Sequence, residues 1–197
     1  MITFGIVAVL GFGNTLLDDL SLASAYICLL LMAVALSLGP LRVLRSNPLA
    51  LNIYWRRDIG IWSGLAGLVH LLVATELSMN QSYMAVYVNL STRGLSDVMR
   101  MDLFSWGSVV GFLVGILVLL LLVLSNNKIM NLLGATWWKR LQRIAYPAFM
   151  LTVLHGFAFQ ALEARSIFLV VTLFAVLIGV LTLQVTGFMA VKKRVGQ

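Results

Sequence analysis

The sequence has little charge: only 11% of its 197 residues are Asp, Glu, Lys or Arg, against about 25% in ordinary soluble domains. Hydrophobic residues make up 61%, against roughly 45–50% in those domains. A soluble core cannot bury that much apolar surface, and uncharged runs such as 103–124 match the roughly 20 residues that a helix needs to cross a bilayer. The composition therefore predicts an all-α, polytopic transmembrane helical bundle in a lipid bilayer.

Cysteine is nearly absent, since Cys28 is the only one. A single cysteine excludes a disulfide within the chain and a thiolate metal cluster. The sequence also lacks a phosphate-cradling loop, a nucleophile beside a base and a cluster of carboxylates. Because no polar stretch is long enough for a soluble domain, we expect 1–197 to form a single transmembrane domain without a nucleotide-binding or flavin-binding domain.

Five apolar segments are predicted to span the membrane: 20–41, 59–77, 103–124, 144–162 and 167–191. A sixth segment, 2–17, is short for a full crossing, and we interpret it as a tilted or partial span. The connection 78–102 has an amphipathic pattern, which predicts a short helix on the membrane surface.

Basic residues are concentrated in three short segments. These hold eleven of the fourteen cations: Arg42, Arg45, Arg56, Arg57, Lys128, Lys139, Arg140, Arg143, Lys192, Lys193 and Arg194. Alternate crossings place all three on one side of the membrane, and six of the seven acids fall on the other. Since basic residues in short loops stay in the cytoplasm, we expect a cytoplasmic C-terminus. The net charge of +7 then needs no nucleic-acid partner.

Histidine is also rare, and both histidines, His70 and His155, fall inside predicted spans. Ligand-capable residues in hydrocarbon are costly and are often functional. His70 lies 13 residues beyond Arg57 and His155 lies 12 beyond Arg143. At about 1.5 Å per residue, both lie roughly 18–20 Å from the cytoplasmic boundary. Two imidazoles on different helices at one depth are what a haem with two axial histidines requires.

Glycines accompany the histidine pair. Gly64 and Gly67 precede His70 by six and three residues, and we predict that they clear its helix face for a flat macrocycle. Three more form a small-xxx-small ladder that predicts close helix packing: Gly107, Gly111 and Gly115. The alternative for the histidines is a hydrogen bond across the bundle, which we favour less for a depth-matched pair than for an isolated histidine.

The motifs around both histidines resemble the ferric reductase-like transmembrane domain family, especially the haem-binding membrane subunit of the bacterial methionine-sulfoxide reductase system. The resemblance covers about 20–155 and rests on three motifs: Gly39-Pro40-Leu41, Arg56-Arg57-x-x-Gly60-x-Trp62 before His70, and Trp138-x-x-Leu141-x-x-x-x-Tyr146 before His155. It implies a six-helix bundle in a bacterial inner membrane that passes electrons across the membrane through b-type haems.

The chain departs from this family pattern at two positions. Members commonly carry a further histidine thirteen residues before the last one, and members with two haems carry another fourteen residues before the first ligand. These positions are Gln142 and Arg56 here, and neither side chain is an ordinary axial ligand. The resemblance therefore implies that the inner haem is lost and that one outer haem b remains.

The leading hypothesis is a membrane subunit for electron transfer that holds one haem b on the outer side of the membrane. Its axial ligands would be His70 and His155, oriented by acceptors such as Thr152 or backbone carbonyls. Because the chain lacks its own redox domain, we expect a protein partner or a diffusible carrier such as quinone as donor or acceptor, and whether the chain is itself an enzyme is left open. The alternatives are a structural or assembly subunit of a larger membrane complex and, least favoured, a small transporter.

Overall fold

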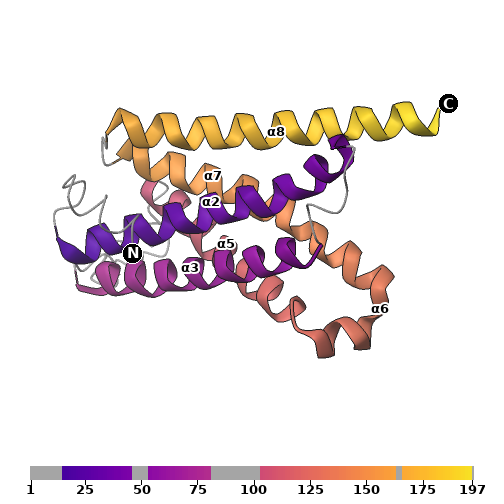
Figure 1. The fold of residues 1–197 in the computed structure, drawn as a ribbon. Coiled ribbons are helices and arrows are strands. Elements are labelled where there is room, and N and C mark those ends of the chain that lie inside the picture. The colour runs from indigo at the N-terminus through magenta and orange to yellow at the C-terminus, as the bar shows by residue number, and fades with distance from the viewer. Residues whose placement is uncertain (1–14, 46–52, 81–102, 163–165, 197) are drawn as a thin grey trace, which may run out of the picture.

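The structure, a computed structural model, describes residues 15–45, 53–80, 103–162 and 166–196 (Figure 1). The described residues form helices and no strand. In chain order these are α2 (Leu16–Leu44), α3 (Ile53–Asn80), α5 (Leu103–Leu124), α6 (Asn127–Leu141), the 3-10 helix η3 (Gln142–Ile144), α7 (Ala145–Leu162) and α8 (Ile167–Val195). Most of the predicted segments 2–17 and 78–102 lies outside the described residues.

Four of these helices are long and apolar enough to cross a membrane: Leu16–Leu44, Trp55–Leu77, Trp106–Leu124 and Ile167–Arg194. They correspond to four of the five predicted spans, so the prediction of an all-α protein with several membrane-spanning helices is confirmed. The remaining predicted span, 144–162, corresponds to α7, which packs against α5 in the bundle. The crossing of α7 stays a prediction.

Helix α2 is the centre of the bundle, because it contacts α3, α7 and α8. It begins at the N-cap Thr15, whose hydroxyl oxygen accepts a hydrogen bond from the backbone N–H of Asp18 at 3.2 Å. Leu36 of α2 and Phe149 of α7 are among the most deeply buried side chains of the core. The buried side chains of α2 thus hold α3, α7 and α8 together.

Pro40 lies inside α2, where it cannot donate a hydrogen bond to the carbonyl of Leu36 four residues earlier. The side chain of Gln184 on α8 donates to this carbonyl instead, at 2.9 Å. Gly187, one turn further along α8, allows the close approach, because a Cβ there would lie 2.8 Å from Cβ of Pro40. A neighbouring helix thereby satisfies the backbone group that a proline frees inside a span.

Helix α6 was not predicted, since its charged and polar residues were interpreted as part of a connection. It begins at the N-cap Asn126, it buries none of its residues, and Gly134 interrupts it with a φ of 74°. The indole N–H of Trp138 donates to the carbonyl of Leu124 at 2.6 Å, which holds α6 against the end of α5. This helix projects beyond one end of the bundle, on the side of α3 and α5 (Figure 1).

The three cationic segments meet at this same end. Arg194 near the end of α8 donates to the carbonyl of Val43 at the end of α2, at 3.0 Å. Arg57 near the start of α3 donates to the side-chain oxygen of Asn127 on α6. The predicted grouping of the cations at one end of the helices is therefore confirmed, and we call it the cationic end.

Candidate functional site

The structure brings the two predicted ligands together. His70 on α3 and His155 on α7 are both partly buried, and their ring centroids are 6.1 Å apart with an angle of 69° between the ring planes. The helix rise predicted that the two residues share one depth, and this short separation agrees with it. We call these two residues the histidine pair.

Each imidazole is oriented by a backbone carbonyl on a neighbouring helix. Nδ1 of His70 lies 3.0 Å from the carbonyl oxygen of Ser21 on α2 and 3.2 Å from its hydroxyl oxygen. Nδ1 of His155 lies 2.8 Å from the carbonyl oxygen of Gly107 on α5. Because a carbonyl only accepts, Nδ1 carries the hydrogen in both rings. In each neutral ring the lone pair is then on Nε2, the nitrogen that can bind a metal.

We expected Thr152 or backbone carbonyls to accept hydrogen bonds from the two imidazoles. In the structure, backbone carbonyls are the acceptors. The hydroxyl of Thr152 instead donates to the carbonyl of Ala148 on its own helix, at 2.8 Å. The positioning roles of Ser21 and Gly107 were missed. Every residue has a backbone carbonyl, so the residue type does not show which carbonyl will accept. Only the packing of the helices identifies these two positions.

The glycine ladder of α5 packs closely, as predicted. A Cβ at Gly107 would lie 3.3 Å from Cβ of Ala158, and one at Gly115 would lie 3.2 Å from the side chain of Leu71. Gly111 faces the imidazole of His155, and a Cβ there would lie 2.6 Å from Nδ1. The ladder therefore also makes room for one member of the histidine pair.

Gly64 and Gly67 face neighbouring helices, and their role beside a macrocycle stays a prediction. A Cβ at Gly64 would lie 2.6 Å from the side chain of Leu122, and one at Gly67 would lie 3.1 Å from the sulfur of Cys28. Side chains of α5 and α2 thus occupy the space beside these glycines. Six residues turn a helix by about 600°, which puts Gly64 roughly 120° away from His70. Both glycines therefore take part in helix packing.

The donor set fits a haem better than a bare metal ion. Within the described ranges, no group of three or more His, Cys, Asp or Glu side chains could hold a metal ion. A bare zinc ion takes three or four protein ligands, whereas a porphyrin supplies four nitrogens and asks the protein for two.

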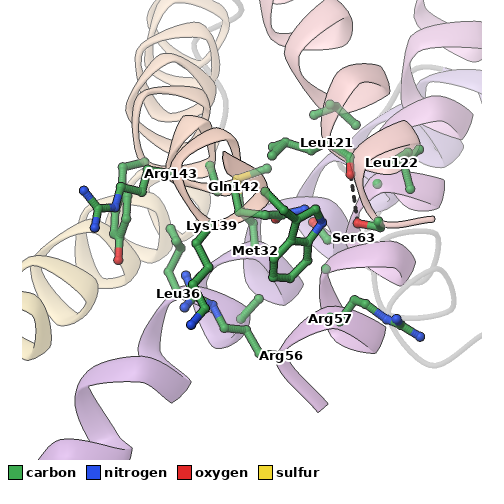
Figure 2. Close-up of a pocket in the computed structure, with 18 residues that line it drawn as sticks. Met32, Leu36, Arg56, Arg57, Ser63, Leu121, Leu122, Lys139, Gln142 and Arg143 are labelled. Atoms are coloured by element: carbon green, nitrogen blue, oxygen red, sulfur yellow. Dashed lines mark hydrogen bonds between the residues drawn. The ribbon is translucent and has the colours of Figure 1, made fainter. Parts of the chain in front are cut away.

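The two positions that depart from the family pattern line a cavity at the cationic end. This cavity has a volume of about 340 Å³, and its lining includes Arg56, Gln142, Trp138 and Tyr146 (Figure 2). Arg56 precedes His70 by fourteen residues, or about 21 Å of helix. The cavity is therefore a second feature, separate from the histidine pair.

The fold and the site define a class, a polytopic helical membrane protein with two neighbouring histidines inside its bundle. No protein-family model matches the chain, and no solved structure matches it either. The resemblance to the ferric reductase-like family therefore rests on the sequence motifs alone.

Proposed function

We propose that this chain is the membrane subunit of an electron-transfer system and that it holds one b-type haem between His70 and His155. In this proposal α7 is a fifth span, the cationic end faces the cytoplasm of a bacterial cell, and the histidine pair lies toward the outer side. The bound haem would supply reversible one-electron chemistry of its iron.

The observation that supports this proposal best is the state of the two imidazoles. Each ring uses Nδ1 to donate to a carbonyl, at 3.0 Å for His70 and 2.8 Å for His155. A metal-binding histidine usually donates its second N–H in this way, because the hydrogen bond fixes the ring and raises its basicity. Both rings are thus held with the same nitrogen available for a ligand bond, from two different helices.

The distance between the histidine pair and the cationic end bears on where electrons would enter the protein. The histidine pair lies about 20 Å of helix from the cationic end, which is long for a single electron transfer through protein. We therefore place the donor and the acceptor nearer the opposite surface, as a quinol or a redox protein, unless a partner's cofactor reaches deep into the cationic end. The described residues contribute binding and orientation to this reaction rather than a proton or a nucleophile.

A structural role is the second candidate, and one observation favours it. The same hydrogen bonds tie α3 to α2 through Ser21 and α7 to α5 through Gly107. Such bonds stabilise a bundle with or without a cofactor. In that case the chain would be a structural or assembly subunit of a larger membrane complex.

The test is a reduced-minus-oxidised absorption spectrum of the protein purified from cells with ample haem. We expect a b-type band in the wild type and its loss in His70→Ala and in His155→Ala. Phe157→Leu is the matched control, because Phe157 is on the same helix as His155 but is 47% exposed and packs against Phe174. It should keep the band.

Added imidazole separates ligation from folding. A glycine at position 70 or 155 leaves room for free imidazole, which should restore the band if the histidine is a ligand. A wild-type protein without any band, combined with histidine variants that only melt at lower temperature, would support the structural role instead.

A further inference from the structure

The cavity at the cationic end has two unlike walls. Deeper in the bundle its lining is apolar: Met32, Leu36, Val118, Leu121 and Leu122 from α2 and α5. At the end of the bundle its lining is cationic: Arg56 and Arg57 from α3, Lys139 from α6 and Arg143 from η3. In Figure 2, Arg56 and Lys139 extend into the same region, whereas Arg57 and Arg143 extend toward opposite sides.

The cationic wall has no matching acids. No Asp or Glu is among the described residues that line the cavity. Asp58 is nearby and lies 3.9 Å from Arg57, but its side chain is largely exposed. Arg56 and Lys139 share one region of this partly apolar space (Figure 2), and their positive charges produce a potential that attracts an anion.

One hydrogen-bond donor in this cavity also lacks an acceptor. The hydroxyls of Ser63 and Ser125 and the indole of Trp138 already donate to backbone carbonyls. By contrast, Nε2 of Gln142 is buried without a hydrogen-bond partner. Buried polar groups are normally satisfied, so this donor indicates a ligand that brings an acceptor oxygen.

We infer that the cavity binds an anionic phospholipid, with the phosphate oxygens at Gln142 and the cations and with an acyl chain along the apolar wall. A free phosphate ion would satisfy the donor at Gln142, but it would leave most of a 340 Å³ cavity and its apolar wall unfilled. Basic pockets between spanning helices on the cytoplasmic side bind lipid headgroups of this kind. The inference does not depend on haem at the histidine pair.

The experiment is native mass spectrometry of the detergent-solubilised protein, titrated with phosphatidylglycerol, with phosphatidylcholine or with inorganic phosphate. The wild type should bind one phosphatidylglycerol more tightly than phosphatidylcholine, and phosphate should not compete. Loss of one cation should weaken binding about fivefold, and the double variant Arg56→Gln/Lys139→Gln about 25-fold.

The matched control is Arg42→Gln/Lys128→Gln, which removes the same charges from exposed positions in the same cationic segments but outside the cavity. It should leave the affinity unchanged. Equal weakening in both double variants would overturn the inference, because it would mean that the lipid responds only to the overall charge. Competition by inorganic phosphate would overturn it too, in favour of a free anion.

A variant that keeps the charge of the protein separates a loss of lipid binding from misfolding. Gln142→Leu should weaken the binding of phosphatidylglycerol, since a donor is lost. It should also raise the melting temperature of the lipid-free protein, since a buried unpartnered amide is removed. Unchanged lipid affinity in this variant would contradict the proposed role of Gln142.

Discussion

The histidine pair and the cationic end differ in how their buried hydrogen-bond donors are satisfied. In the histidine pair, both imidazoles donate to backbone carbonyls, those of Ser21 and Gly107. At the cationic end, Nε2 of Gln142 is a buried donor without a partner beside a cavity. The comparison teaches that the protein itself holds the two imidazoles in place, as the proposed haem site requires. The inferred phospholipid would complete the second site.

The largest effect is expected where α5 makes room for the histidine pair. Gly111→Ala would put a methyl group 2.6 Å from Nδ1 of His155, so the ring or the helix must move. We expect a loss of about 1–3 kcal/mol of stability together with most of the bound haem. Gly179→Ala is the control, because a Cβ there has nothing within 4 Å. Absorption and thermal unfolding in detergent measure both effects.

If Gly111→Ala kept the haem and the stability of the wild type, the packing of α5 against His155 would not matter. The histidine pair would then be no better preorganised than the cationic end, and the comparison would fail.

An intermediate effect is expected for a buried hydrogen-bond chain that links α2, α7 and α8. The hydroxyl of Tyr26 donates to the carbonyl of Leu169 at 2.8 Å and accepts from the side chain of Gln160 at 3.1 Å. Tyr26→Phe removes both bonds and should cost about 1 kcal/mol, as hydrogen bonds inside membrane bundles do. Thermal unfolding in the Gln160→Leu background checks it, because the two changes should be less than additive.

The smallest effect is expected at the surface of the cationic end. Arg194 is exposed and donates to the carbonyl of Val43. Arg194→Gln should change the stability by less than about 0.5 kcal/mol, since exposed polar contacts are weak. A destabilisation as large as that of Tyr26→Phe would mean that the two ends are held equally firmly.

The sequence predicted the features that depend on residue type and helix rise. Apolar runs gave four spans that the structure contains, and the counts from Arg57 and Arg143 predicted that His70 and His155 share one depth. The glycine ladder on α5 was also predicted to pack closely, because small residues at every fourth position let neighbouring helices approach each other.

Three features could not be predicted, each for a physical reason. Helix α6 is polar and is interrupted at Gly134, so its pattern resembles a loop. The imidazole of His70 contacts the backbone carbonyl of Ser21. Every residue has a backbone carbonyl, so residue type does not identify this acceptor. The neighbours of Gly64 and Gly67 are side chains of α5 and α2, and the spacing of the glycines before His70 does not identify them. All three are decided by tertiary packing.

The most direct measurement is the number of haem groups bound per purified chain, determined by extraction and absorption. The preorganised histidine pair and the ligandless inner positions, Arg56 and Gln142, together predict a single haem per chain. A count of zero would remove the redox role and leave a structural bundle. A count of two would mean that the cationic end also binds haem, which would contradict the difference between the two ends.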